Sequence, residues 1–148
     1  MKKFIRFLCI ALALSMLLAI PAYAESAAEP RGSAFFAAYG TDLYKASSTS
    51  FEIWFDVDAN LDMMDVIGVS EIVVYRSSNG QSGWTEVRTY DMDDYPEMTT
   101  TYDFSHTGYV TYDTAITGYY YRAYVTFHAK NSRGIGERDV YTEIIRMQ

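Results

Sequence analysis

The chain has 148 residues, of which 49% are hydrophobic and 16% aromatic, and it carries a formal net charge of −7. Such an acidic surface repels nucleic-acid phosphates and anionic membranes, which argues against a nucleic-acid-binding role. The single cysteine, Cys9, lies in the apolar N-terminal run. The rest of the chain therefore has no thiol for disulfide bonds, thiolate catalysis or metal binding.

The N-terminal segment has the three parts of a secretory signal peptide. Three basic residues among the first six precede an apolar run over residues 7–20, and an A-x-A pattern ends at Ala24. This run is shorter than the roughly 20 residues that cross a bilayer, which favours cleavage over a membrane anchor. We therefore predict a cleaved signal peptide at residues 1–24, a secreted, extracellular protein, and no stable membrane insertion after cleavage.

Removal of residues 1–24 leaves a chain of single-domain size. This chain keeps nine basic and all nineteen acidic residues, a formal net charge of −10. We predict a flexible leader at residues 25–40 and one domain at 41–148. Proline is rare in this part, whereas tyrosine, threonine, valine, isoleucine and phenylalanine are plentiful, which favours β-strands.

Residues 51–62 alternate between apolar and polar side chains. Residues such as Phe51, Ile53 and Phe55 fall on one face of an extended chain, and the polar face carries Trp54 among carboxylates. A period of two predicts a strand with one apolar and one acidic face.

The acidic residues at the end of this strand raise the question of a calcium site. An EF-hand that began at Asp56 would need glycine at its sixth and glutamate at its twelfth position, where Leu61 and Ile67 stand. We interpret the stretch as a solvated strand face and loop, with a calcium site of another kind as the less favoured alternative. The ligands of that alternative site are Asp58, Asn60, Asp62 and Asp65.

A β-hairpin is predicted over residues 71–90. Two strand-like segments, 71–77 and 84–90, flank an Asn79-Gly80 step that favours the positive φ angles of a hairpin turn. An acidic loop over residues 91–97 follows, and we interpret it as solvated. Weak calcium binding is again the less favoured alternative, with Asp91, Asp93 and Asp94 as ligands.

The C-terminal part continues the β pattern. Strands are predicted at 107–113, 119–131 and 137–146, with a glycine-containing turn between the last two. In the second of these, Tyr121 and the other odd-numbered residues share one face, and Tyr120, Arg122 and Tyr124 share the other. About seven strands with turns between them indicate an all-β, antiparallel sandwich or barrel.

Two segments resemble fibronectin type III modules. "IVVYRSSNGQSGWTEV" (72–87) is similar to the middle hairpin of these modules, and "GYYYRAYVTFHAKNSRGIGE" (118–137) to their penultimate strand and the turn after it. The resemblance covers residues 41–146 and implies an antiparallel immunoglobulin-like β-sandwich, with Tyr121 as the corner tyrosine. The sequence departs from the family in placing Trp54 on the polar side and in lacking the proline before the corner. The whole chain also resembles small exported proteins of Gram-positive bacteria that have no assigned function.

The sequence offers little support for catalysis. It has only two histidines, His106 in a predicted turn and His128 on the outer face of a strand, where we expect it to be exposed, and it has no G-x-S-x-G motif. Paired carboxylates could hydrolyse glycosides, but no pair stands out. We therefore predict a protein that is not an enzyme and needs no cofactor.

The aromatic residues on predicted outer faces are the stronger candidates for function. Planar rings beside charged groups stack on sugars or anchor protein partners, although they also pack against cross-strand neighbours. We predict a secreted, non-enzymatic binding module whose partner is an unknown extracellular protein or glycan. The alternatives are a carbohydrate-binding module and a small secreted hydrolase with paired carboxylates. The candidate contact residues are Trp54, Tyr120, Arg122 and Tyr124, with Trp84 and Tyr90 as secondary candidates.

Overall fold

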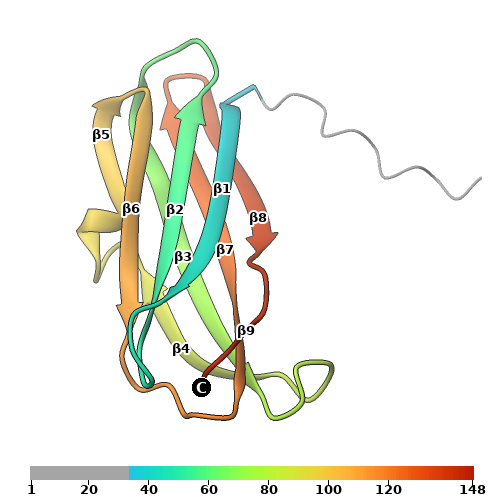
Figure 1. Ribbon diagram of the computed structural model, residues 1–148. Coiled ribbons are helices and arrows are strands. Elements are labelled where there is room, and N and C mark those ends of the chain that lie inside the picture. The colour runs from blue at the N-terminus through green and yellow to red at the C-terminus, as the bar shows by residue number, and fades with distance from the viewer. Residues whose placement is uncertain (1–33) are drawn as a thin grey trace, which may run out of the picture. The chain divides into compact units, whose positions relative to one another are not determined.

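The computed structural model describes residues 34–148, which form two antiparallel β-sheets packed face to face (Figure 1). The predicted all-β antiparallel sandwich is therefore confirmed. The predicted signal peptide and residues 25–33 lie outside the described residues. The elements are β1 (Phe36–Lys45), β2 (Phe51–Ala59), β3 (Met64–Ser77), β4 (Thr85–Asp91), the 3-10 helix η1 (Pro96–Met98), β5 (Thr99–Asp103), β6 (Ser105–Tyr112), β7 (Tyr120–Asn131), β8 (Gly134–Tyr141) and β9 (Ile145–Arg146).

The two sheets divide the strands unequally. The three-stranded sheet has the order β1-β2-β6 and forms the front layer of Figure 1. The six-stranded sheet has the order β4-β3-β7-β8, with β5 pairing along the first part of β3 and β9 along the start of β7. This arrangement is compatible with an immunoglobulin-like fold.

The alternation read from the sequence places the core. In β2, Phe51, Ile53, Phe55 and Val57 are buried between the sheets, and the residues between them face outward. The odd-numbered residues 121–129 of β7 are buried in the same way. The predicted hairpin is also present, because β3 pairs with β4 and Gly80 has a φ of 73°.

Four strand assignments differ from the sequence-based expectation. Residues 36–40, which were expected in the leader, form the first half of β1. This strand was not predicted because its small residues give no clear alternation. β3 begins at Met64 rather than at residue 71. Its residues Ile67, Gly68 and Val69 are all buried, and its register with β7 shifts after Val69, so the period of two is interrupted. β5 was not predicted, and the strand predicted at 137–146 is divided into β8 and β9, so the described residues contain nine strands rather than about seven.

Tyr121 forms a corner that ties the start of β7 to the preceding loop. Its side chain is fully buried, and its hydroxyl accepts a hydrogen bond of 2.8 Å from the backbone N–H of Ile116. A tyrosine at this place, with its hydroxyl bonded to backbone a few residues upstream, is a feature of immunoglobulin-like sandwiches. The contact agrees with the role that the resemblance gave to Tyr121.

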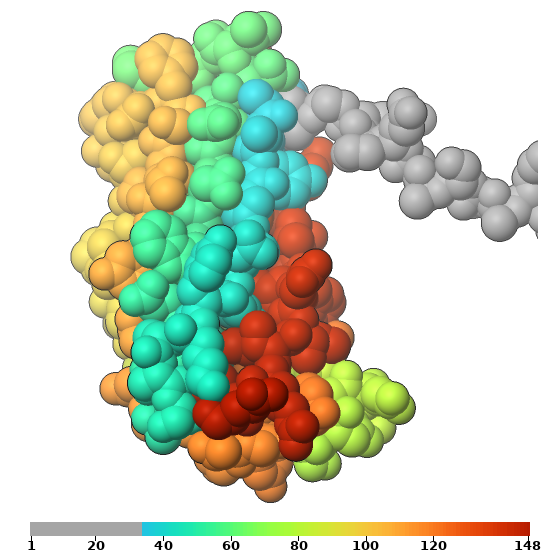
Figure 2. All heavy atoms as spheres, viewed as in Figure 1, coloured from blue at the N-terminus to red at the C-terminus, as the bar shows by residue number. Residues whose placement is uncertain are grey.

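The C-terminal residues pack beside the end of β1. Met147 is fully buried, and its backbone N–H donates to the carbonyl of Tyr119 at 3.0 Å. The ammonium group of Lys45 donates to the carbonyl of Gln148 at 2.8 Å. Figure 2 shows these last residues, in dark red, against the lower part of the face that β1 and β2 form.

Candidate binding surfaces

Three aromatic side chains, one from each strand, form a row across the outer face of the three-stranded sheet. Trp54 of β2 stacks on Tyr109 of β6 with ring centroids 4.8 Å apart and planes inclined by 23°. Tyr44 of β1 meets the other side of Trp54 edge-on, at 6.2 Å. The three side chains are 55% (Tyr44), 36% (Trp54) and 49% (Tyr109) exposed. We call Tyr44, Trp54 and Tyr109 the aromatic row.

The aromatic row is held in place before any ligand arrives. The indole N–H of Trp54 donates to the carboxylate of Glu52 at 2.8 Å, and Trp54 lies directly opposite Tyr109 in the register of β2 and β6. A side chain fixed by a hydrogen bond and by stacking loses little further rotamer freedom on binding. The row is therefore suited to binding a partner without rearrangement.

The same face is acidic. Lys45 is the only lysine or arginine in β1, β2 and β6, and its ammonium group is engaged at the end of β1. A negative surface with exposed aromatic rings attracts cationic groups both by charge and by cation–π contact. The carboxylates on this face are Asp42, Glu52, Asp56 and Asp58.

A groove of about 710 Å³ runs along the open edge of the sandwich, next to the aromatic row. One wall consists of residues 107–114, from β6 and the turn after it, and the opposite wall carries Arg88, Tyr90, Tyr95 and Glu97. Because Tyr109 belongs to both, the groove and the aromatic row form one continuous surface.

Tyr90 connects the two sheets at the base of this groove. It is 4% exposed, and its hydroxyl donates to the carbonyl of Thr111 at 2.9 Å. Burial raises the pKa of Tyr90 to about 12. The Arg88 guanidinium lies 5.3 Å from the Tyr90 ring centroid. It also donates a hydrogen bond of 2.7 Å to the Tyr95 hydroxyl, and this bond raises the pKa of Arg88. Tyr90 is thus a buried link between the sheets rather than an exposed contact residue.

A second aromatic group surrounds Arg122 on the outer face of the six-stranded sheet. The guanidinium carbon of Arg122 lies 4.4 Å from the ring centroids of both Trp84 and Tyr141, and 5.9 Å from that of Tyr75. Burial is the main cause of the raised pKa of Tyr75. The Nε atom of Arg122 is buried without a hydrogen-bond partner. In this group the rings pack against their own neighbours, which is the alternative that the sequence left open.

Tyr124 and Tyr120 lie on either side of this group along β7. Tyr124 packs on Tyr141 with ring centroids 4.8 Å apart, and a hydrogen bond to Asp139 raises its pKa. Tyr120 lies under the β3–β4 turn, since a Cβ atom on Gly80 would come within 2.7 Å of its ring. The structure therefore divides the sequence-predicted contact residues between two opposite sheets, with Trp54 apart from the others.

The acidic loops are organised by contacts within the chain. The Asp62 carboxylate forms an ion pair with Arg133. In the loop after β4, the Asp91 carboxylate accepts the N–H of Asp93 at 2.8 Å, and its carbonyl accepts that of Asp94 at 3.1 Å. Within residues 34–148 no three histidine, aspartate or glutamate side chains are grouped so as to hold a metal ion. The weak calcium site stays a prediction.

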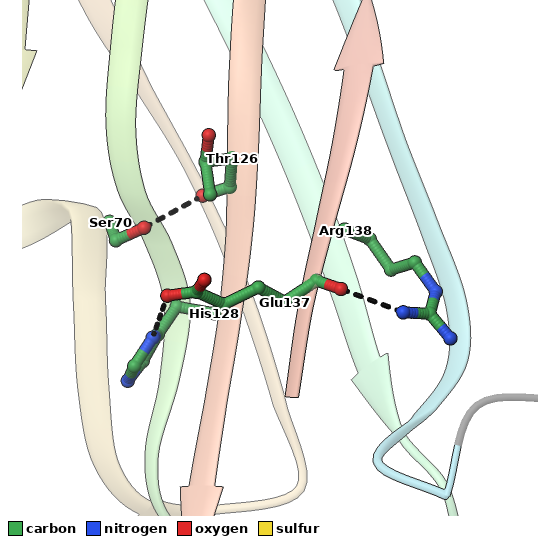
Figure 3. Close-up of polar contacts among 5 residues, drawn as sticks. All are labelled: Ser70, Thr126, His128, Glu137 and Arg138. Atoms are coloured by element: carbon green, nitrogen blue, oxygen red, sulfur yellow. Dashed lines mark hydrogen bonds and ion pairs between the residues drawn. The ribbon is translucent and has the colours of Figure 1, made fainter. Parts of the chain in front are cut away.

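His128 differs from the sequence-based expectation because it is buried. It lies on the outer face of β7 but is 7% exposed, and its cross-strand neighbour is Gly68. In Figure 3 the Glu137 side chain reaches across to the His128 ring, with Nδ1 and Oε1 3.4 Å apart. The nearby Ser70 hydroxyl donates to the carbonyl of Thr126 at 3.3 Å rather than to the ring (Figure 3). These three side chains therefore do not have the nucleophile–base contact of a hydrolytic triad.

No protein-family model matches the chain, and no curated protein matches it. Within the described part of the chain, no helix is long and apolar enough to cross a membrane.

Proposed function

We propose that this protein is a secreted, non-enzymatic binding module of the immunoglobulin-like, fibronectin-type-III-like kind, and that it contacts its partner through the aromatic row. The observation that carries the proposal is the exposed, hydrogen-bonded stack of Trp54 between Tyr44 and Tyr109. The N-terminal signal pattern supports export, and the sheet order and the Tyr121 corner support the fold relationship. The Gram-positive likeness of the whole chain suggests a bacterial source.

The geometry of the row favours a protein over a glycan as the partner. Near-parallel rings whose centroids are 4.8 Å apart overlap one another, so Trp54 and Tyr109 each use one ring face internally. Tyr44 stands nearly perpendicular, at 85° to Trp54. A sugar-binding platform needs rings whose faces lie free in one plane, and the row does not offer them. The acidic residues around it favour a basic extracellular protein.

The proposal is tested by comparing variants of the chain from residue 25 onward. We expect wild-type protein to capture a partner from a panel of extracellular proteins and glycans, and Trp54→Ala to lose that binding while retaining its melting transition. Tyr102→Ala is the matched control, because Tyr102 is 71% exposed but lies outside the row. Equal binding by wild-type protein and Trp54→Ala would contradict the proposal, and binding only to glycans would support the carbohydrate-binding alternative.

The hydrolase alternative has its own observation and its own test. Glu97 and Asp113 both line the groove, and glycoside hydrolysis uses a pair of carboxylates on either side of the scissile bond. A hydrolase would turn over glycosides in a substrate panel and would lose this activity in Glu97→Gln or Asp113→Asn. Turnover by the wild-type protein that either variant abolishes would replace the binding proposal.

A further inference from the structure

The edge strand β6 lacks the charged residues, proline and bulges that normally protect a sheet edge. Exposed edges are usually blocked by charged residues, proline, bulges or a covering element. The sequence of β6, SHTGYVTY, contains no aspartate, glutamate, lysine, arginine or proline, and its register with β2 runs from Tyr112 to Ser105 without a shift.

The other edges of the two sheets do carry protective features. The register of β1 with β2 shifts between Phe36 and Ala38, and that of β3 with β4 shifts between Val74 and Tyr75. β4 carries Glu86 and Arg88, and β8 has three successive charged residues at 137–139. Unlike β1, β4 and β8, β6 therefore carries neither a charged residue nor a register shift, and it borders the groove.

Backbone groups of β6 point into that groove. The carbonyl of Thr111 faces away from β2, because it accepts the hydroxyl of Tyr90 from the opposite wall. Along an antiparallel strand, the N–H and C=O of one residue point to the same side, and the side alternates from residue to residue. Thr107 and Tyr109 therefore direct their N–H and C=O groups to the same edge. Within residues 34–148 no backbone hydrogen bond from that side reaches either residue.

We propose that β6 binds an extended, basic peptide segment of a partner protein by strand addition in this groove. The inference deepens the proposed function and rests on it, since Tyr109 belongs to both the row and the groove. Alternate side chains of an added strand would continue the outer face beside Thr107, Tyr109 and Thr111, and the others would enter the groove.

Charge identifies the chemistry of the peptide. In the register of β2 and β6, Asp56 lies opposite Thr107 and Glu52 lies opposite Thr111, so carboxylates flank the stacked pair of rings at both ends. Lysine or arginine at the outward positions would meet these carboxylates and the ring of Tyr109. A second copy of the chain is disfavoured, because residues 34–148 carry 17 acidic and 8 basic side chains and two acidic faces would adjoin.

The first test uses a synthetic ten-residue peptide of alternating lysine and valine, with a glutamate–valine peptide as the control. We expect the chain from residue 25 onward to bind the lysine peptide by calorimetry and not the glutamate peptide. Thr107→Pro removes an N–H that faces the groove rather than β2, so the pairing of β6 with β2 should be retained. It should weaken binding about tenfold, since the ladder hydrogen bond that this N–H would donate is lost while the C=O of residue 107 remains. Thr107→Ala, which keeps the N–H, should bind as the wild type does.

The second test does not depend on a variant. Addition of the lysine peptide should slow amide hydrogen exchange at Thr107 and Tyr109 at least about tenfold and leave Ile53 of β2 unchanged. Unchanged exchange at both edge amides would overturn the strand addition.

The outcomes separate this inference from the proposed function. If Trp54→Ala loses a captured partner but Thr107→Pro retains it, the aromatic row stands and the strand addition is overturned. If neither variant loses the partner, both proposals are overturned. If sedimentation shows a dimer that Thr107→Pro dissociates, the occupant of the edge is a second copy, and the basic-peptide proposal is overturned.

Discussion

Trp54 and Tyr109 stack across neighbouring strands of the three-stranded sheet, with ring centroids 4.8 Å apart, on the side that faces away from the core. A stacked pair on an outer face adds little to the hydrophobic core, because both rings remain partly in water. Contiguous exposed patches of large apolar side chains often mark a site of contact with another molecule. We therefore expect Trp54 to contribute more to binding than to the stability of the fold.

Trp54→Ala should lower the free energy of unfolding by only about 1 kcal/mol, the size of an aromatic pair contact. Phe55→Ala, on the adjacent inward position, should lower it by about 3–5 kcal/mol, because Phe55 is 2% exposed and its removal leaves a cavity. Urea denaturation of both variants and the wild type measures the two values. Equal losses would mean that Trp54 is part of the core and would weaken the case for the aromatic row.

Tyr121→Phe should destabilise the fold although it removes a single oxygen atom. The hydroxyl of Tyr121 accepts the N–H of Ile116 at 2.8 Å, and phenylalanine leaves that donor without its partner. We expect a loss of about 1–3 kcal/mol in unfolding free energy. Tyr109→Phe is the control for removal of an exposed hydroxyl, and its unfolding free energy should be unchanged. If the melting temperatures of the two variants agree, the corner contact has no energetic role.

Gly68→Ala should be among the most damaging single changes in the domain. Gly68 has a φ of +152°, and a Cβ atom there would come within 2.2 Å of the Met98 carbonyl oxygen. We expect a loss of more than about 2 kcal/mol, because both the backbone conformation and the neighbouring segment must change. Gly83→Ala separates the two causes, since Gly83 also has a positive φ but no atom lies within 4 Å of the added Cβ. Its denaturation midpoint should fall less.

Tyr90 predicts a pH dependence of stability in the alkaline range. Its pKa of about 12 in the folded protein lies above the ordinary tyrosine value of 10.0, so the folded state holds the phenolic proton more tightly than the unfolded chain does. The contribution of Tyr90 to stability is therefore complete below pH 10 and is lost as the pH rises through 12. The advantage of the wild type over Tyr90→Phe in unfolding free energy should shrink over this range, by on the order of 2 kcal/mol. An advantage that stays constant with pH would show that Tyr90 has an ordinary pKa.

The sequence predicts the faces of single strands better than it predicts the neighbours of a residue. The inward position of Ile53 and the outward position of Trp54 follow from a period of two, which is a local property of the chain. The contact of Trp54 with Tyr44 and Tyr109 depends on which residues pair across strands, and this register is fixed by the packing of distant segments. The outward aromatic in "HTGYVTY" was a usable signal for Tyr109, whereas β1 offered none for Tyr44.

For the same reason, the sequence predicted the outer-face positions of Arg122 and His128 but not the neighbours of Arg122 or the burial of His128. Parity correctly puts Arg122 on an outer face, but its position between Trp84 and Tyr141 requires the alignment of three strands. Parity also puts His128 outside, yet its burial arises beside Gly68, where the Met98 backbone comes close to the sheet. Surface exposure depends on such covering segments and not on strand period alone.

The two tryptophans of the chain report on opposite sides of the sandwich. Trp54 donates to Glu52 within the aromatic row, while Trp84 lies against the Arg122 guanidinium on the six-stranded sheet. Intrinsic fluorescence therefore contains one optical signal for each side. In a Trp84→Phe background the tryptophan emission comes from the three-stranded side alone, so a change in that emission locates an unknown binding event before any partner is identified.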